Sequence, residues 1–331
     1  MAKRIALLYG GKGKEHDVSV MGYEYVRELL SNSEYEILPV YIDESGCWYV
    51  RIKNVLSPAY PTSKLGGSLY TGCDLVKIYA AIPLLHGDGG EDGTVQGALE
   101  CAGIPYVGAD VSASAVCLDK AYTKAVASSL GIPTLKGVCA AKNESTDSAL
   151  KRCKAVINFP MFIKPRRLGS SVGAYPVNDE DDFRRCYPQA SREGCGLVMV
   201  EERLDNKREL ECAYAEIDGE RIITPPGEVL INGFYGYGEK YGGKTRTEPR
   251  ANVTHEIEST VTGYAKILAE AISLRHLARI DFFLSGDTVY FNEINTFPGF
   301  TRESLYPKML ERYGIDPGYA LLSFVKDALS C

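Results

Sequence analysis

The sequence predicts an α/β protein with a parallel sheet in its N-terminal domain and an α+β arrangement further along the chain. Strand-like apolar runs alternate with helical runs near the N-terminus, which is typical of a parallel sheet. Near the C-terminus a helical repeat is followed by two neighbouring strands instead. The 331 residues are 45% hydrophobic and 24% charged. That ordinary globular composition favours two or three domains of about 100 to 200 residues each.

The first domain is expected over residues 1–115. Its alternating pattern predicts strands at 5–8, 37–42 and 78–85 and helices at 19–30 and 94–102. Residues 43–75 break this pattern, because Pro58, Pro61 and the Gly66-Gly67 pair interrupt it. We therefore expect residues 43–75 to form an excursion on the first domain.

The second domain is expected over residues 116–205. Asp119 is a plausible N-cap for a helix whose pattern stops at Leu130, and Gly131 follows in the C-terminal capping position. Strands are predicted at 161–164 and 197–200, with a helix near 179–187 between them.

The third domain is expected over residues 206–331. Apolar residues recur at helical spacing from Ile257 to Ile272, which predicts a helix packed on a sheet. Strands at 279–284 and 288–295 flank a Ser285-Gly286-Asp287 turn, and this arrangement predicts a β-hairpin.

Composition excludes several classes of protein. Because 37 Lys and Arg face 43 Asp and Glu, the net charge of -6 gives no basic footprint for nucleic acid or an anionic membrane. No apolar run approaches the roughly 18 residues of a membrane span, and the first run is too short for a signal peptide, so a soluble protein is expected. The ten cysteines form no CxxC motif, which favours reduced thiols and a cytoplasmic location. His255-Glu256 lacks the second histidine of a zinc hydrolase motif.

Two glycine-rich segments lie between a predicted strand and a predicted helix. In GGKGKEHDVS, residues 10–19, backbone N–H groups and a helix N-terminus face one crevice suited to an anion or polar ligand. This segment fits neither the GxGxxG fingerprint nor a Walker loop, and by itself it also fits a simple turn with a solvated Glu15. In HGDGGEDGT, residues 86–94, the glycines allow substrate or phosphate to approach closely, although a turn is again the alternative.

A second kind of loop follows the strand that ends at Lys164. The sequence continues PRRLGSSVG, so Gly169, Ser170, Ser171 and Gly173 offer N–H and hydroxyl donors to an anion. A flexible surface loop is the alternative interpretation. The later strand that runs into Glu201-Glu202 either offers its edge to adenine or merely reaches solvent.

The C-terminal hairpin carries the most specific pattern. Side chains alternate along a strand, so Arg279 shares a face with Asp281, and Glu293 shares one with Asn295. A turn with an odd number of residues would place all four on the same face. Asp, Glu and Asn supply the oxygen ligands that Mg²⁺ prefers. Without a metal, Arg279 would have to satisfy all three buried groups, which is the structural alternative.

Taken together and in this order, these motifs resemble the D-alanine:D-alanine ligases of the ATP-grasp superfamily. The matching segments cover nearly the whole chain and are GGKGKEHDVS, HGDGGEDGT, LDK, IKPRRLGSSVG, VEERL, GEKY, RID and NEINTFPGFTRESLYP. The resemblance implies a three-domain ATP-grasp fold of the longer form, in which residues 43–75 are the extra segment of the first domain.

The resemblance also implies roles for the residues that would bind the amino acids. Glu15, supported by Ser19, is expected to bind the ammonium group of the first D-alanine. Arg279 and the Gly299 N–H are expected to bind its carboxylate and then the oxyanion. His86 lines the same pocket by this resemblance. The second D-alanine is expected against three residues, Ser304, Leu305 and Lys240.

For the nucleotide, the resemblance implies phosphate contacts from Lys120 and Lys164 and a phosphate cover formed by the loop of Ser170 and Ser171. Adenine is expected against the segment of Glu201, Glu202 and Leu204, with Glu209 at the ribose. Two Mg²⁺ ions, or Mn²⁺ in their place, are expected on Asp281, Glu293 and Asn295.

A closing network of Ser170, Tyr241 and Glu15 is also implied by the resemblance. Two departures affect it: Gly236 stands where the family commonly has aspartate, and the segment after Tyr241 is about two residues short by family resemblance.

The implied function is ATP-dependent ligation of two D-alanines through an acyl phosphate, for peptidoglycan precursors, by a cytoplasmic homodimer. A sibling ligase that uses D-serine or D-lactate second is the nearest alternative. Two residues argue against this alternative. D-lactate ligases commonly carry histidine in place of Tyr241, and D-serine ligases often carry arginine in place of Leu305. A nucleotide-dependent oxidoreductase and a non-catalytic nucleotide-binding module are the more distant alternatives; the failed fingerprint and the carboxylate-rich hairpin argue against them.

Overall fold

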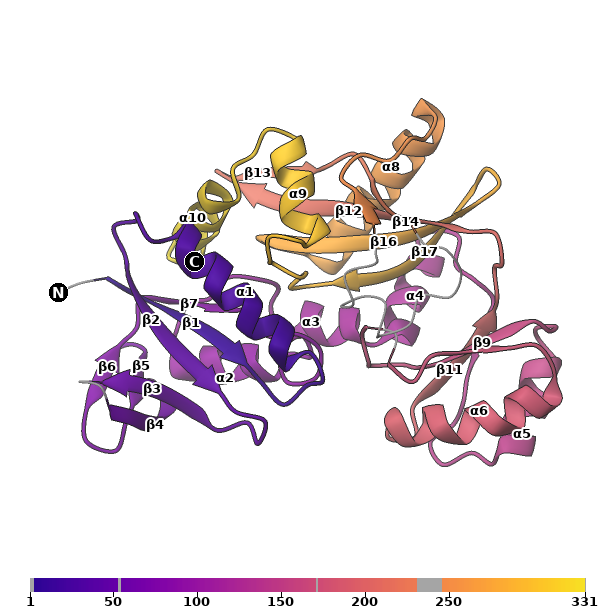
Figure 1. Ribbon diagram of the computed structural model, residues 1–331, viewed down its shortest axis with the longest axis horizontal. Helices are drawn as coiled ribbons and strands as arrows, with labels where there is room; N and C mark the ends of the chain where they lie inside the picture. Colours follow the sequence, from indigo (N-terminus) through magenta and orange to yellow (C-terminus); the bar gives the residue numbers. More distant parts are fainter. Residues whose placement is uncertain (1–2, 53–54, 171, 231–245, 331) are drawn as a thin grey trace.

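The computed structural model describes residues 3–52, 55–170, 172–230 and 246–330. Within these ranges the chain forms three β-sheets that carry helices on their faces (Figure 1). The cysteines described are free thiols. Of the helices that the structure describes, none is long and apolar enough to span a membrane.

The first sheet has seven strands in the order β6-β5-β4-β3-β2-β1-β7. β1 (Arg4–Gly10) lies between β2 (Glu36–Ile42) and β7 (Ala80–Pro83) and is parallel to both. α1 (His16–Leu29) connects β1 to β2, and α2 (Thr94–Ala102) follows β7. The predicted alternation of strands and helices is therefore confirmed in this part of the sheet.

The excursion after β2 extends the same sheet. It forms β3 (Trp48–Ile52), β4 (Val55–Thr62), β5 (Ser68–Tyr70) and β6 (Leu75–Lys77). Each of these strands is antiparallel to its neighbour. Strands close in sequence pair in this way because a parallel pair needs a long crossover connection. Only the β2-β1-β7 part of the sheet is parallel, so the prediction of a parallel sheet covers part of it.

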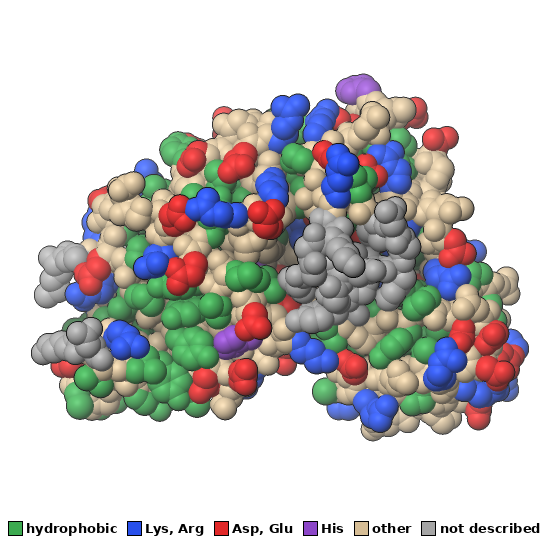
Figure 2. Space-filling model, in the orientation of Figure 1, with side chains coloured by type: hydrophobic (Ala, Val, Ile, Leu, Met, Phe, Trp, Pro, Cys, Tyr) green, Lys and Arg blue, Asp and Glu red, His purple; other side chains and the backbone are tan. Residues whose placement is uncertain are grey.

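Hydrophobic side chains gather over this extension on the face that Figure 2 shows. Exposed large apolar residues of the extension are Val55, Leu56, Tyr60, Leu65, Tyr70 and Leu75. Three of them belong to directly paired positions, since Tyr60 pairs with Tyr70 and Tyr70 with Leu75. These three side chains therefore share one face of the sheet.

The second sheet lies in the central part of the chain and has the order β10-β9-β11-β8. Its strands are β8 (Gly137–Cys139), β9 (Met161–Pro165), β10 (Tyr175–Val177) and β11 (Val198–Glu202), and its helices are α5 (Thr146–Lys154) and α6 (Glu180–Glu193). α6 continues past the expected end at residue 187 despite Pro188, because Phe183, Tyr187 and Ala190 bury one continuous apolar face.

Two helices lead from the first sheet to the second, namely α3 (Val111–Leu118) and α4 (Lys120–Ser129). The side chain of Asp119 accepts a hydrogen bond from the N–H of Ala121, so the predicted N-cap of α4 is confirmed.

The third sheet has the order β15-β14-β12-β16-β17, with β13 paired to β12. Its strands are β12 (Arg208–Ile217), β13 (Glu220–Ile223), β14 (Gly227–Leu230), β15 (Arg246–Glu248), β16 (Leu277–Ser285) and β17 (Thr288–Asn295). α8 (His255–Ile272) packs on it through Val261, Ala265 and Leu268, each 0% exposed, as the helical spacing predicts.

The C-terminal helices return to the first sheet. α9 (Leu305–Arg312) and α10 (Pro317–Ala328) follow β17, and α10 lies beside the N-terminal strands (Figure 1). Leu321 and Phe324 of α10 belong to the same buried core as Ile5 and Leu7 of β1. The first and third sheets are therefore joined by one hydrophobic core, which fixes their relative position.

Candidate active site

Two cavities share a wall where the three sheets come together. The larger, of about 1260 Å³, is lined by parts of α1, by the segment from His86 to Glu91 and by residues 293–305. The smaller, of about 500 Å³, is lined by β9, β11 and the β16–β17 hairpin. The residues that line both cavities are Lys120, Gly169, Ser170, Glu211, Arg279 and Glu293. This shared wall allows a molecule in one cavity to react with a molecule in the other.

The hairpin turn differs from the turn that the sequence suggested. Ser285 pairs with Thr288, so the turn contains only Gly286 and Asp287. An even number of turn residues would place the two pairs of polar side chains on opposite faces, contrary to what a metal site needs.

A β-bulge brings the two pairs of polar side chains back to the same face. Between Asp281 and Phe282 the register shifts by one residue, so that Asp281 pairs with Glu293 and Arg279 pairs with Asn295. Directly paired residues project to the same face, and the residue that the bulge adds is Asn292. The four polar side chains therefore lie together, as the sequence predicted, but through a bulge and not through the turn.

The charges on this face are paired within the protein. Arg279 donates to both carboxylate oxygens of Asp281, at 2.8 Å from Nε and 2.7 Å from Nη2, and its Nε lies 3.0 Å from Oε2 of Glu211. Burial works against the charge of Arg279, but Asp281 and Glu211 outweigh it and raise the pKa of Arg279. The sequence motifs did not identify Glu211 as a site residue. A strand drawn over residues 208–217 would have placed it, because it lies opposite Asp281 on β12.

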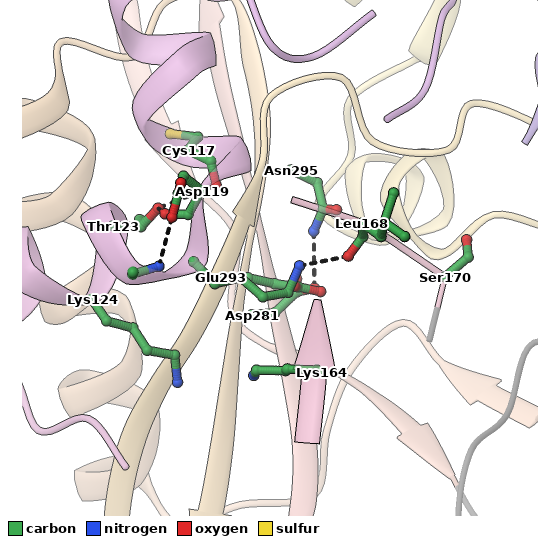
Figure 3. Close-up of polar contacts among 12 residues, drawn as sticks. Cys117, Asp119, Thr123, Lys124, Lys164, Leu168, Ser170, Asp281, Glu293 and Asn295 are labelled. Atoms are coloured by element: carbon green, nitrogen blue, oxygen red, sulfur yellow. Dashed lines mark hydrogen bonds and ion pairs between the residues drawn. The ribbon is translucent and has the colours of Figure 1, made fainter. Parts of the chain in front are cut away.

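Two further contacts complete the shared wall. Asn295 donates from Nδ2 to Oδ2 of Asp281 at 3.0 Å (Figure 3). Lys120 forms an ion pair with Glu293, with Nζ 3.0 Å from Oε2, and donates to the carbonyl oxygen of Leu168 at 2.8 Å. Lys120 therefore connects the hairpin to the loop after β9.

The donor set at the wall suits a magnesium ion. Asp281 and Glu293 offer carboxylates and Asn295 an amide oxygen, and Mg²⁺ is commonly held by one or two carboxylates while substrate phosphates and waters complete its shell. Among the described residues no group of three His, Cys, Asp or Glu side chains converges as a metal site. A set with only two carboxylates agrees with that finding, and it fits an ion that arrives with a phosphate-bearing ligand.

Lys164, on β9, contacts an acidic residue on β11. Its Nζ lies 2.6 Å from Oε2 of Glu201, and Nζ of Lys124 from α4 lies 2.5 Å from Oε1 of the same carboxylate. Figure 3 shows Lys124 and Lys164 reaching the same region from different elements. Burial opposes ionisation of Glu201, but the two lysines outweigh it and lower the pKa of Glu201 to about 2. The sequence motifs did not single out Lys124.

The other residues expected near a nucleotide line the smaller cavity. They are Glu202, Leu204 and Glu209. Glu209 forms an ion pair with Lys207 at 2.6 Å, and Glu202 accepts a hydrogen bond from the N–H of Lys136 at 3.0 Å. Leu204 follows the end of β11 and is among the residues that line the cavity.

On the side of the first sheet, Glu15 precedes α1 and meets the loop after β9. Oγ of Ser170 donates to Oε1 of Glu15, and Ser170 adopts a left-handed backbone conformation with φ of 50°. Ser19 lies one turn into α1 and is fully buried. Its Oγ accepts from the N–H of Gly10 at 2.9 Å and donates to the carbonyl oxygen of Leu84. Ser19 thus fixes the start of α1 against the end of β1 and the residue that follows β7.

The segment after β7 holds the backbone that follows β17. Nδ1 of His86 lies 3.1 Å from the carbonyl oxygen of Phe297, and the Phe297 N–H donates to Oε1 of Glu91 at 3.0 Å. Oε2 of Glu91 accepts from the N–H of Gly87 at 2.9 Å. Desolvation raises the pKa of Glu91. Glu91 was overlooked in the sequence, although it stands inside the HGDGGEDGT motif.

The remaining expected residues lie just beyond Phe297. Gly299, Ser304 and Leu305 all line the larger cavity. Ser304 is the N-cap of α9 but makes no side-chain cap bond, and its Oγ lies 2.8 Å from Oγ1 of Thr301. Leu305 is 5% exposed. A helix N-terminus and an apolar side chain therefore face this end of the larger cavity.

Three expected residues fall outside the described part of the chain. These are Ser171, Lys240 and Tyr241. The departure noted at Gly236 and the shortened segment after Tyr241 also lie there, up to residue 245. Their roles stay predictions.

Comparison with known proteins gives consistent matches over the whole chain. Profiles described as D-ala D-ala ligase N-terminus and D-ala D-ala ligase C-terminus match residues 4–109 and 126–325. A D-alanine–D-alanine ligase from Caldicellulosiruptor bescii is 34% identical over 94% of this chain and 91% of its own.

Two solved structures share the fold. The D-alanyl-alanine synthetase A of Vibrio cholerae is 33% identical with a TM-score of 0.89, over 100% of this chain and 99% of the other. The VanG D-Ala:D-Ser ligase of Enterococcus faecalis is 31% identical with a TM-score of 0.88, over 99% of this chain and 100% of the other.

Proposed function

Because the chain belongs to the D-alanine–D-alanine ligase family of ATP-grasp enzymes, we propose that it joins two D-alanines with the energy of ATP hydrolysis to ADP and phosphate. The observation that carries this proposal is the shared wall of the two cavities. A nucleotide in the smaller cavity and amino acids in the larger one would meet at Arg279, Glu293 and Lys120. The product, D-alanyl-D-alanine, would serve peptidoglycan precursor synthesis.

The first step is transfer of the γ-phosphate of ATP to the carboxylate of the first D-alanine. Glu15 binds the ammonium group of this amino acid, while Arg279 holds its carboxylate. Lys120 and Lys164 offset the phosphate charge, since phosphoryl transfer depends on positioning and on electrostatic stabilisation. The adenine lies against the segment of Glu201, Glu202 and Leu204, and Glu209 contacts the ribose.

The metal belongs to this first step. Asp281, Glu293 and Asn295 would hold Mg²⁺, which would supply positive charge to neutralise the phosphates. We propose two ions and expect Mn²⁺ to replace them. Arg279 and Lys120, which pair with these carboxylates, keep their charge balanced when no ion is bound.

In the second step the amine of the second D-alanine attacks the carbonyl carbon of the acyl phosphate. A tetrahedral oxyanion forms, Arg279 and the Gly299 N–H stabilise it, and phosphate leaves. Ser304 with the start of α9 receives the second carboxylate, Lys240 supplies a countercharge and His86 lines the pocket. Closure of the Ser170–Ser171 loop, with Tyr241 bonding toward Ser170 and Glu15, excludes the water that would hydrolyse the intermediate.

A second candidate is a ligase that places D-serine in the second position, which the similarity to the VanG D-Ala:D-Ser ligase favours. Leu305 favours D-alanine, because it presents apolar surface to the methyl group and no partner for a hydroxyl. An apolar pocket rejects an added hydroxyl by only about a hundredfold at best. Some D-serine incorporation is therefore expected.

The test is phosphate release from ATP and Mg²⁺ with a panel of D-amino and D-hydroxy acids, with dipeptides separated by mass. We expect release that requires D-alanine, and D-alanyl-D-alanine as the main product when D-alanine and D-serine are equal. Dominant alanyl-serine would change the substrate assignment. Release without any D-amino acid would contradict the ligase itself.

The proposal also covers the domain boundaries, the cellular location and the oligomeric state. The three domains are taken as residues 1–115, 116–205 and 206–331, and the enzyme is taken as cytoplasmic. We also propose a homodimer, supported by the exposed apolar residues over β4 to β6. Light scattering at several protein concentrations tests the dimer.

A further inference from the structure

A buried lysine lies behind the nucleotide cavity. The side chain of Lys124, on α4, is 5% exposed and lines neither of the two cavities. Its Nζ forms an ion pair with Oε1 of Glu201 at 2.5 Å. Lys124 therefore lies outside the two cavities, and its contact with Glu201 is the route by which it would influence a nucleotide.

The same carboxylate contacts Lys164, which does line the smaller cavity. Nζ of Lys164 lies 2.6 Å from Oε2 of Glu201, whose side chain is 2% exposed. With Lys164 alone, Glu201 would form a neutral pair, and this pair would present no net charge to phosphates. With Lys124 on its other oxygen, the group of three carries a net charge of about +1.

A packing role alone explains Lys124 poorly. Replacing buried ion pairs by apolar side chains is often neutral or stabilising, so close packing on α4 does not require a charge at this position. Among the described residues, the ion pair of Lys124 is with Glu201, and that carboxylate in turn contacts Lys164.

We propose that Lys124 is a positioning residue that neutralises Glu201 from its second carboxylate oxygen and so leaves Lys164 with positive charge to offer the nucleotide phosphates. This inference rests on the proposed function, since it assumes that the smaller cavity binds ATP. It assigns Glu201 a side-chain role beside any contact of its backbone with adenine.

The test compares ligands with and without phosphates on the full-length protein. In Lys124→Met, Glu201 pairs with Lys164 alone, so the dissociation constant of ATP should rise about tenfold or more, as expected for loss of a unit charge several ångströms away in a partly buried setting. The dissociation constant of adenosine, which has no phosphate, should stay within about twofold of the unmodified protein. Calorimetry for ATP and ligand-observed NMR for adenosine give the two values.

A second variant restores the charge balance. In Lys124→Met/Glu201→Gln, Lys164 again contributes one net positive charge, so most of the ATP affinity should return. Lys151→Met, on the exposed face of α5, removes the same charge from the same domain and should leave both affinities unchanged. If Lys124→Met does not fold, Lys124→Gln replaces it, since glutamine keeps a donor for Glu201 without the charge.

The outcomes distinguish failure of the role of Lys124 from failure of the proposed function. Equal loss of ATP and adenosine binding, no loss of either, or no recovery in the double variant would each overturn the role of Lys124. Failure of the unmodified protein to bind ATP at all would instead overturn the proposed function.

Discussion

The hairpin side of the site and the side facing the first sheet are assembled in different ways. On the hairpin side, Asn295 and Asp281 are 14 positions apart in sequence and lie on adjacent strands. On the other side, Ser170 contacts Glu15 across 155 positions and Phe297 contacts Glu91 across 206. Changes on the hairpin should therefore impair chemistry while the fold persists, whereas changes at the long-range contacts should affect substrate binding and domain docking together.

The largest effect is expected on the hairpin. Asp281→Asn or Glu293→Gln removes a charged oxygen ligand, so ATP-dependent phosphate release should fall by more than the roughly 10- to 100-fold typical of an outer-shell change at a metal site. The fold should persist, although the weakened ion pair with Arg279 or Lys120 should lower the melting temperature. Phosphate release measured over a Mg²⁺ titration, with a thermal melt for each variant, checks both points. A variant that regains the full rate at saturating Mg²⁺ would show that its carboxylate is no ligand.

A smaller effect on activity, but a loss of stability, is expected for Glu91→Gln. Glutamine has one acceptor oxygen, so either Gly87 or Phe297 would lose the partner of its N–H, at about 1 to 3 kcal/mol for a buried unsatisfied group. The KM for D-alanine should rise, because the backbone leading to Gly299 is no longer held. Steady-state kinetics and denaturant unfolding measure the two effects.

The matched control for Glu91 is its neighbour. Asp92→Asn changes a carboxylate whose hydrogen bonds, among the described residues, go to Asp88, Gly89 and Thr94 of its own segment. It should leave the KM for D-alanine unchanged. An equal rise in both variants would point to the loop as a whole and not to the contact with Phe297.

The closing network should give a moderate effect. Ser170→Ala removes the hydroxyl that donates to Glu15, and Tyr241→Phe removes the hydroxyl expected to reach Ser170. Each should slow dipeptide synthesis, and the double variant should show a coupling energy of about 0.5 to 3 kcal/mol if the two act together. Strictly additive losses in single-turnover rates would exclude a common network.

The smallest effect is expected at a long-range contact away from the site. His276 accepts from the Gly108 N–H at Nδ1, 2.9 Å away, and its Nε2 lies 3.0 Å from Oδ2 of Asp327. Burial and Arg275 lower the pKa of His276 below its usual 6.5, with Asp327 opposing them. The unfolded chain therefore takes up a proton first as the pH falls below 6.5.

The lower pKa of His276 in the folded protein determines how stability changes with pH. The free energy of unfolding should decrease below pH 6.5 by at most about 1.4 kcal/mol per pH unit from this residue, and His276→Gln should flatten that dependence. Denaturant unfolding between pH 5 and 7.5 measures it, while the KM for D-alanine at pH 7.5 should not change. An unaltered pH profile in the variant would assign the dependence to another group.

Sequence pattern by itself determined the features that depend on neighbours in the chain. Helical spacing located α8, an N-cap residue located the start of α4, and alternation identified the polar residues of the hairpin. These predictions held because backbone hydrogen bonding and side-chain direction repeat over a few residues. The order of the motifs was enough to indicate the family that the comparisons identify.

Only the tertiary structure decided how those residues meet. The bulge at Asn292 sets which face Glu293 occupies, and a one-residue shift of this kind leaves no clear mark in the pattern of apolar residues. Glu211, Glu91 and Lys124 gain their roles from partners on other elements of the fold. The sequence named the groups that carry charge, but their pairing depends on how the three sheets pack, since buried charges find their partners through space and not along the chain.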